Sequence, residues 1–221
     1  VLDDDGIFII QTGYHPVQFS KNMFDYIYHE HIYYFTLTTI NNVLKRNGLY
    51  GFDFFQSPIS GGSFVILFKK QKTKYTKKFE RMITYENKSK LNLISNWKKL
   101  NEVCKSHKIK LNKIINKYKT TNKIAAYGAS ARSSTLINYL NLNNKIIKKI
   151  FDLNSLKSEL YTPGTHIKIQ KPIPQSVKNF DVIILLAWNF KDEILQFLKK
   201  IKFKGDVIIP LPKIELVKLK K

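Results

Sequence analysis

The chain has 221 residues, a formal net charge of +22 at pH 7 and a hydrophobic content of 43%. That length and apolar content are enough for one large or two small globular domains. The positive charge is almost all lysine, with guanidinium groups only at Arg46, Arg81 and Arg132. Because proteins that read nucleic-acid bases favour the planar fork of arginine, we expect no nucleic-acid partner.

Cysteine usage and hydropathy set further limits. The single cysteine, Cys104, excludes an internal disulfide and a cysteine-based zinc site within the chain and favours a reducing, cytoplasmic setting. No apolar run approaches the roughly 20 residues that a membrane helix needs, so we expect no membrane partner. The chain begins with Val1, and its first residues are typical of a turn entering a strand, which predicts a segment missing upstream.

The first part of the chain is predicted to contain strands and one short helix. Residues 7–10 form an apolar run of the kind found in fully buried parallel strands. Helical spacing of apolar residues predicts a helix over 38–46, with Thr38 or Thr39 as its cap. Two runs rich in aromatic and branched residues predict paired strands at 49–55 and 63–68.

The second part of the chain is predicted to alternate strands with helices. Apolar residues at helical spacing over 91–118 indicate a helical connector that leads into it. The predicted strands lie at 123–127, 146–151, 181–187 and 207–209, and the predicted helices at 133–140 and 192–201. Such alternation is typical of a parallel, doubly wound α/β sheet.

Gly128 follows a predicted strand and precedes a predicted helix, where backbone amides and a helix N-terminus can hold a phosphate. It is the only glycine present of the three-glycine dinucleotide motif. Ser130 can donate a hydroxyl hydrogen bond, and Arg132 can bind a diphosphate through two parallel hydrogen bonds. The alternative is that the small residues of this turn only allow close packing of helix on strand.

Three further polar residues are expected at the carboxyl edge of the sheet, where open parallel sheets bind ligands. Asp152 ends the next predicted strand and could accept from a ribose hydroxyl, or it could simply cap a helix. Asn189 follows the strand at 181–187, and His166 lies in a loop with a Pro-Gly pair. An isolated loop histidine can equally be a solvated surface residue.

The run Tyr28, His29, Glu30 and His31 places phenol, base and acid groups in consecutive positions of a chain that has five histidines. If the segment is extended, both histidines share one face. The pattern favours acid/base catalysis. A metal site with both histidines and Glu30, or a core or surface role without chemistry, are the alternatives.

Five motifs in the same order make the chain recognisable. They are residues 24–31 with Tyr34 and Phe35, then 61–63, 127–131, 161–166 and 187–190. Together they resemble the sugar C-methyltransferases, which use S-adenosylmethionine to methylate nucleotide-linked keto-deoxysugars. The resemblance extends over nearly the whole chain.

The resemblance implies an α/β fold in three parts. Residues 1–70 would be the end of a class I methyltransferase sheet, 71–120 a helical connector, and 121–221 a Rossmann-like, doubly wound parallel-sheet domain that binds the sugar nucleotide. It also implies S-adenosylmethionine as cofactor, with its main binding motif upstream of this chain. The partners implied are a nucleotide-diphosphate sugar and a missing N-terminal methyltransferase half, which alone would hold zinc.

The resemblance also assigns roles to single residues. His31 would be the general base that removes the proton beside the sugar ketone, Tyr28 a donor to the developing oxyanion, and Glu30 an orienter or proton relay. No residue of this chain is predicted to bind metal. The residues expected to bind substrate are Gly128, Ser130, Arg132, Asp152, Thr162, Gly164, Thr165, His166 and Asn189.

The chain departs from the family pattern at several points. It lacks the zinc-binding cysteines and the glycine-rich turn for S-adenosylmethionine, so we expect it to be inactive alone as a methyltransferase. Ser60 stands where relatives commonly have histidine, and Arg132-Ser133 replaces their Lys-Gly. An NAD(P)-binding oxidoreductase-like domain and a non-catalytic sugar-nucleotide-binding module are the alternative functions.

Overall fold

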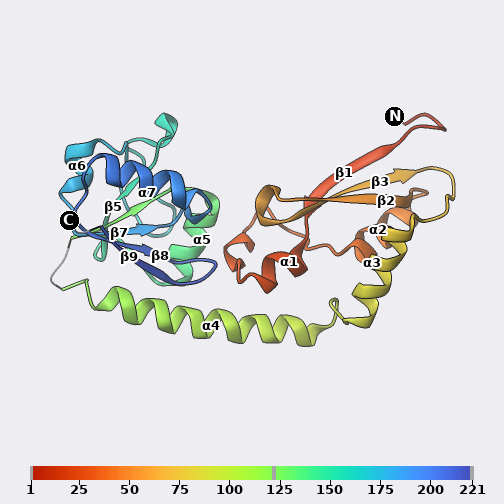
Figure 1. The fold of residues 1–221 in the computed structure, drawn as a ribbon, viewed down its shortest axis with the longest axis horizontal. Helices are drawn as coiled ribbons and strands as arrows, with labels where there is room; N and C mark the ends of the chain where they lie inside the picture. The colour runs from red at the N-terminus through yellow and green to blue at the C-terminus, as the bar shows by residue number, and fades with distance from the viewer. Residues whose placement is uncertain (1, 121–122, 220–221) are drawn as a thin grey trace. The chain divides into compact units, whose positions relative to one another are not determined.

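The computed structural model describes residues 2–120 and 123–219 (Figure 1). Its contacts divide the chain into two compact units. Unit 1 consists of Val1–Met23 and His31–Glu102, and unit 2 of Phe24–Glu30 and Val103–Lys221. The segment Phe24–Glu30 therefore belongs to unit 2, although the residues on both sides of it belong to unit 1.

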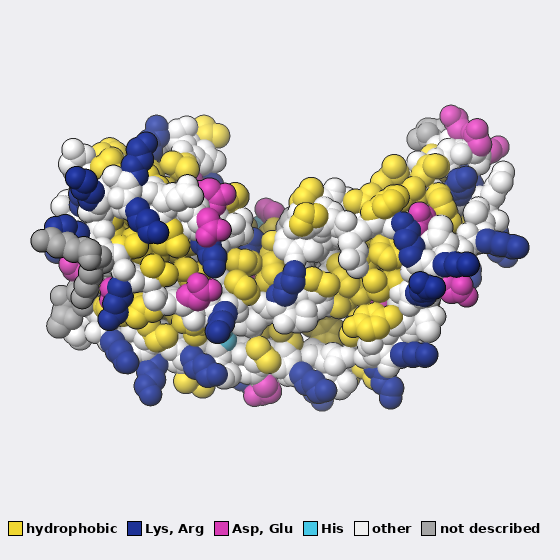
Figure 2. Space-filling view, viewed as in Figure 1, with side chains coloured by type: hydrophobic (Ala, Val, Ile, Leu, Met, Phe, Trp, Pro, Cys, Tyr) yellow, Lys and Arg dark blue, Asp and Glu magenta, His cyan; other side chains and the backbone are white. Residues whose placement is uncertain are grey.

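The sheet of unit 1 has three strands, all paired antiparallel: β1 (Phe8–Gly13), β2 (Tyr50–Ser57) and β3 (Ser63–Lys69). Their order is β1-β3-β2. The predicted pairing of the second and third strands is confirmed. The prediction for residues 7–10 is wrong, because β1 is an antiparallel strand at the sheet edge, with Phe8 37% and Ile9 58% exposed. Figure 2 shows hydrophobic side chains gathered over this strand.

The helices of unit 1 are α1 (His15–Ser20), α2 (Leu37–Lys45), α3 (Lys77–Lys88) and the first part of α4 (Ile94–Asn116). Helices α2 and α3 pack against β2 and against each other. The predicted cap of α2 is wrong by two or three residues. Thr36 has the extended backbone of an N-cap and its hydroxyl accepts from the Thr39 backbone N–H at 3.2 Å, whereas Thr38 lies inside the helix.

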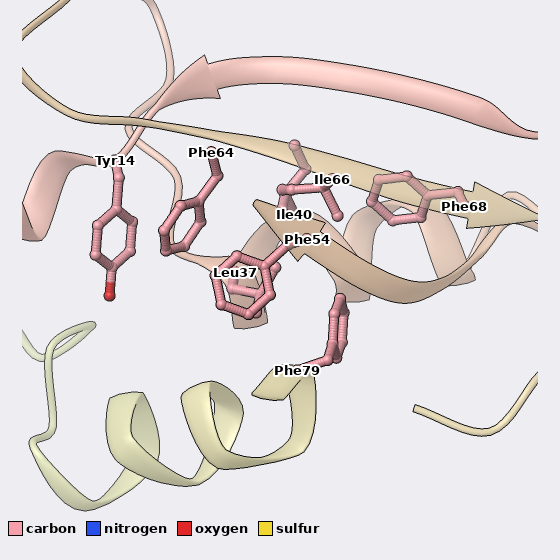
Figure 3. Packing of buried hydrophobic residues seen from close by; sticks show 8 residues of the cluster. All are labelled: Tyr14, Leu37, Ile40, Phe54, Phe64, Ile66, Phe68 and Phe79. Atoms are coloured by element: carbon pink, nitrogen blue, oxygen red, sulfur yellow. The ribbon is translucent and has the colours of Figure 1, made fainter. Parts of the chain in front are cut away.

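The core of unit 1 is strongly aromatic (Figure 3). The buried cluster contains Tyr14, Leu37, Ile40, Phe54, Phe64, Ile66, Phe68 and Phe79. The rings of Tyr14 and Phe64 are stacked with centroids 4.0 Å apart. Full burial of each large apolar side chain contributes about 1.5–3 kcal/mol. The cluster therefore holds the sheet of unit 1 against α2 and α3.

Unit 2 is built on a six-stranded sheet of order β6-β5-β4-β7-β8-β9. The first five strands in this order are parallel, and the last is antiparallel. The strands are β4 (Ile124–Tyr127), β5 (Ile147–Phe151), β6 (Ile169–Gln170), β7 (Val182–Leu185), β8 (Asp206–Ile209) and β9 (Glu215–Lys218). The predicted α/β class and parallel sheet are confirmed, whereas β6 and β9 were not predicted.

The helices of unit 2 cover the sheet. They are the unit's share of α4 (Ile94–Asn116), then α5 (Ala131–Tyr139), α6 (Pro174–Lys178) and α7 (Lys191–Lys200). The chain moves outward from β4 to β5 in one direction and from β7 to β8 in the other. Right-handed crossovers then place α5 and α7 on opposite faces, and the carboxyl ends of β4 and β7 flank the point where the strand order reverses.

None of the helices among the described residues is both long enough and apolar enough to cross a membrane.

Candidate functional site

A cavity of about 560 Å³ lies at the carboxyl ends of β4 and β7, the place at which open parallel sheets bind ligands. It lies wholly within unit 2. Five of the residues predicted to bind substrate line it: Gly128, Ser130, Arg132, Asp152 and Asn189. The structure therefore brings together in one cavity residues that are spread over 62 positions of sequence, from 128 to 189.

Gly128 is required by the turn that follows β4. Its φ is +101°, and a Cβ placed there would lie 2.5 Å from the Cβ of Ala187. Its backbone N–H donates to the Phe151 carbonyl at 2.7 Å, and Ala187 N–H donates to the Tyr127 carbonyl at 3.0 Å. These two hydrogen bonds connect the turn to β5 and to the end of β7. Only glycine fits at this crossing.

Ser130 caps α5 from within the same turn. Its hydroxyl accepts from the Ser133 backbone N–H at 3.2 Å and lies 3.0 Å from the Ser133 hydroxyl. The backbone N–H of Ser130 donates in return to the Ser133 hydroxyl, which completes a capping box. Ser130 therefore stabilises the helix start that faces the cavity, and its hydroxyl is engaged there.

Asp152, at the end of β5, stabilises the turn by hydrogen bonding. One carboxylate oxygen accepts from the Ala129 backbone N–H at 2.7 Å, and the other accepts from Asn154 N–H at 2.8 Å. Lys157 joins this group, since its Nζ donates to the Ala129 carbonyl at 2.8 Å and lies 4.0 Å from Asp152. Lys157 was not predicted, because nothing in its local sequence distinguishes it from the other lysines of the chain.

The remaining wall of the cavity is mostly apolar. Phe190 comes from the short turn after β7, Ile194 and Phe197 from α7, and Leu153 from the loop after β5. These residues were not predicted to line a site, although the spacing of 190, 194 and 197 is that of one helix face. An apolar wall beside a phosphate-type turn suits a ligand with a flat or apolar part next to an anionic part.

Arg132 lines the cavity, but its guanidinium is held by protein groups. Its Nε and Nη2 lie 3.0 and 2.7 Å from one carboxylate oxygen of Asp25, and its Nη1 donates to the Tyr26 hydroxyl at 3.1 Å. The guanidinium predicted to bind a diphosphate is thus paired with a carboxylate of the chain itself, through one hydrogen bond from Nε and an ion-pair contact from Nη2 to the same oxygen. The sequence could not show this pairing, because 107 positions separate the two residues.

The loop with Thr162, Gly164, Thr165 and His166 does not line this cavity. The hydroxyls of Thr162 and Thr165 are buried 2.7 Å apart, and Thr162 also accepts from Ile167 N–H at 3.0 Å. The loop leads into β6, so it lies before the amino end of that strand. The prediction that His166 lies at the carboxyl edge is therefore wrong. The substrate-binding role of this loop stays a prediction.

The segment Phe24–Glu30 brings Tyr28 and Glu30 into unit 2, whereas His31 belongs to unit 1. The segment begins with a 3-10 turn and then bends and turns through Tyr28, His29 and Glu30, so the extended conformation assumed for the histidine pair is not formed. Tyr28 is half-buried, and its ring centroid lies 6.2 Å from that of His29. Burial raises the pKa of the Tyr28 phenol, and the charge of Glu30 adds to the rise.

Unit 1 has a second, smaller cavity of about 350 Å³. The motif Gly61-Gly62-Ser63, which contributes to the resemblance, lines it together with Tyr14 and Lys21. Among residues 2–120 and 123–219, no group of three or more His, Cys, Asp or Glu side chains is arranged to hold a metal ion.

The fold and the cavity define an α/β domain of the doubly wound class, with a ligand site at the point where the strand order reverses. A family model described as the C-methyltransferase C-terminal domain matches residues 58–212. The chain belongs to this family. It is also 25% identical over 216 residues to C-methyltransferase NovU of Streptomyces niveus, an alignment that covers 96% of this chain and 51% of the relative.

The chain thus spans about half the length of that relative. The resemblance to the C-terminal part of C-methyltransferases is confirmed by both matches.

Proposed function

We propose that this chain is the C-terminal part of an S-adenosylmethionine-dependent C-methyltransferase that acts on a nucleotide-linked keto-deoxysugar. The family match supports the class of reaction. The observation that carries the substrate class is the cavity of unit 2, where a glycine turn and a helix start lie beside an apolar wall. A nucleotide diphosphate has both parts that such a cavity selects, an anionic linker and a flat base.

The cavity offers distinct groups for the two parts of such a ligand. The diphosphate would lie at the Gly128–Ser130 turn, where the backbone approaches closely and α5 presents its N-terminus. Lys157 brings a cation to that turn, since its Nζ donates to the Ala129 carbonyl at 2.8 Å. The base would lie against Phe190 and Phe197, with Asn189 within the cavity as a polar contact.

In the proposed reaction, a base removes the proton beside the ketone and leaves an enolate, a carbon nucleophile. We assign the base to His31 and a relay role to Glu30, on the resemblance. Tyr28 would donate to the developing enolate oxygen. The position of Tyr28 beside Glu30 on the segment of unit 2 supports this role.

The described residues of unit 1 do not fit S-adenosylmethionine. The sheet of unit 1 contains only antiparallel pairs, so it has no parallel strand, glycine-rich turn and helix of the kind that holds such a nucleoside. We assign the cofactor, and any zinc, to a methyltransferase half outside this chain. The exposed strand β1 supports this, because among the described residues it pairs only with β3 and leaves Ile7, Phe8 and Ile9 exposed.

Proton abstraction can be tested without a methyl donor. The 221-residue chain is incubated in D₂O with thymidine-diphospho-4-keto-6-deoxyglucose, and deuterium incorporation beside the ketone is followed by NMR. We expect enzyme-dependent incorporation that His31→Ala reduces at least ten-fold, with His29→Ala as the matched control. An active His31→Ala variant would refute the base assignment.

Binding measurements separate the two alternative functions. Calorimetric titration with thymidine diphosphate should show binding that Phe197→Ala weakens. Tight NAD binding without affinity for thymidine diphosphate would favour the oxidoreductase-like domain, against which the lone Gly128 in the turn already counts. Thymidine diphosphate binding by the complete enzyme without deuterium incorporation or methyl transfer would favour the non-catalytic module.

A further inference from the structure

The segment that carries Tyr28 and Glu30 is fastened to unit 2 by a buried ion pair. Asp25, 1% exposed, accepts two hydrogen bonds at one oxygen, from Arg132 Nε at 3.0 Å and Trp188 Nε1 at 2.8 Å, and Arg132 Nη2 lies 2.7 Å from the same oxygen as its ion-pair partner. A carboxylate removed from water is stable only when such donors replace its hydration. The segment therefore has one preferred position on this unit.

The guanidinium of Arg132 is enclosed as well as paired. Its centre lies 3.9 Å from the ring centroid of Tyr26 and 4.7 Å from that of Trp188, so it is held between two aromatic rings. The third nitrogen, Nη1, donates to the Tyr26 hydroxyl. All three nitrogens thus contact residues of the chain, and the side chain is only 15% exposed. A diphosphate at this guanidinium would therefore compete with Asp25 for it.

Both partners of Asp25 come from the strand ends that form the cavity. Arg132 lies in the first turn of α5, directly after the Gly128–Ser130 turn, and Trp188 follows β7 and precedes Asn189. The cluster of Asp25, Arg132 and Trp188 thus connects the proposed acid/base segment to both sides of the proposed nucleotide site.

We propose that Arg132 is a positioning residue that holds the segment Phe24–Glu30 on unit 2, and is not a diphosphate ligand. Its fork and its two ring contacts set where Tyr28 and Glu30 lie relative to a nucleotide bound at Gly128. The consequence for proton transfer rests on the proposed function. The anchoring of the segment does not depend on it.

Hydrogen exchange of the 221-residue chain, followed by mass spectrometry, tests the anchor directly. The Ile27 N–H, which donates to the Phe24 carbonyl at 3.0 Å, lies inside the segment and reports its order. We expect Arg132→Gln and Asp25→Asn each to speed exchange in peptides covering 24–30 at least ten-fold, with β4 and β7 unchanged. Arg132→Lys, which keeps the charge without the fork, should give a smaller increase.

Unchanged exchange in 24–30 for Arg132→Gln would overturn the proposal. If that variant also loosens β4 and β7, the double variant Asp25→Asn/Arg132→Gln decides, because it leaves no unpaired buried charge. Faster exchange confined to 24–30 in the double variant supports the anchor, and unchanged exchange refutes it. Arg81 is an exposed arginine of unit 1, and Arg81→Lys is the control. It should leave the hydrogen exchange of 24–30 unchanged.

The deuterium-incorporation assay then separates positioning from binding. For Arg132→Lys we expect kcat to fall at least ten-fold, with KM for the sugar nucleotide within two-fold of the wild type. If Arg132 instead binds the diphosphate, Arg132→Lys should raise KM ten-fold or more and leave the hydrogen exchange of 24–30 unchanged. That result would overturn the proposal. If the wild-type chain incorporates no deuterium, the proposed function fails, and the hydrogen-exchange result still decides whether Arg132 anchors the segment.

Discussion

The indole N–H of Trp188 donates to the Asp25 carboxylate at 2.8 Å, although 163 positions separate the two residues. Both side chains are buried, so this hydrogen bond lies away from competing water. Burial raises the pKa of the Asp25 carboxyl, and the Arg132 guanidinium and the Trp188 N–H oppose that rise because they stabilise the ionised form. Trp188 therefore acts as a polar partner as well as a packed ring.

Trp188→Phe keeps an aromatic ring but removes the donor. We expect it to lower the free energy of unfolding of unit 2 by about 2 kcal/mol, the usual size of a hydrogen bond to a charged group. Urea denaturation followed by circular dichroism measures the loss. A double-mutant cycle is the control: in an Asp25→Asn background the same substitution should cost less, and equal losses in both backgrounds would contradict the assignment.

Glu86 should be essential to unit 1. The side chain is 0% exposed, and its two oxygens accept from Leu37 N–H at 2.8 Å, Thr38 N–H at 2.7 Å and the Thr38 hydroxyl at 2.6 Å. A carboxylate from α3 thus satisfies the free amides at the start of α2. Glu86→Gln turns one acceptor into a donor that faces these N–H groups, so we expect a loss of about 3 kcal/mol.

Denaturant unfolding of Glu86→Gln beside Glu80→Gln checks this prediction. Glu80 is an exposed residue of the same helix, and its neutralisation should change the free energy of unfolding by no more than about 1 kcal/mol, the size of a helix-dipole effect. Similar losses in the two variants would show that the buried contacts of Glu86 contribute little.

Local patterns predicted most of unit 2 correctly. Its buried strands are short apolar runs, and the small residues after β4 mark a turn whose chemistry depends only on neighbours in sequence. The same reasoning failed for residues 7–10, because an apolar run does not reveal whether its strand is central or, like β1, at an edge. It failed for His166 because the two-residue strand β6 was too short to detect, so the direction of the loop was unknown.

The partners of the site residues could not be predicted, for a different reason. Arg132 was expected to bind phosphate, because its type and position after the turn fit that role. Its actual partner, Asp25, lies 107 positions away, and no sequence period connects the two. The same holds for Glu86 and Thr38, which are 48 positions apart. Residue types are local information, but the pairing of charges is decided by how distant elements pack.

Gly128→Ala should destabilise unit 2 for two separable reasons. The positive φ of +101° is unfavourable for any residue with a Cβ, and the new methyl group would lie 2.5 Å from that of Ala187. We expect a loss of about 3 kcal/mol or more from strain and overpacking together. Gly48→Ala isolates the first cause, because Gly48 has a φ of +75° but no atom within 4 Å of its added Cβ.

The Gly48 variant should lose only about 1 kcal/mol. Thermal unfolding of both variants gives the comparison. If Gly128→Ala costs no more than Gly48→Ala, the close approach of the turn to the end of β7 is not a constraint. In that case thymidine diphosphate binding should also survive the substitution.

Unit 1 should lose stability in mild acid because of His15. This side chain is buried, its Nδ1 lies 2.8 Å from the Phe35 carbonyl, and its ring stacks on Trp97 with centroids 5.5 Å apart. Burial lowers the pKa of His15 below its ordinary value of 6.5, although the Phe35 carbonyl and the charge of Glu86 oppose this. The unfolded chain therefore binds a proton more readily than the folded one as the pH falls below 6.5.

The contribution of His15 to stability should thus be fully present above pH 6.5 and decline as the pH falls from there toward the lowered pKa of the folded state. Urea unfolding of unit 1 followed by Trp97 fluorescence, in a Trp188→Phe background, measures it at pH 7.5 and at lower values. His15→Asn keeps a donor for the Phe35 carbonyl but does not titrate, so its stability should depend less on pH than that of the parent. His29→Gln, which removes an exposed histidine, should leave the pH dependence of unit 1 unchanged. Equal pH dependence in the parent and His15→Asn would show that another group is responsible.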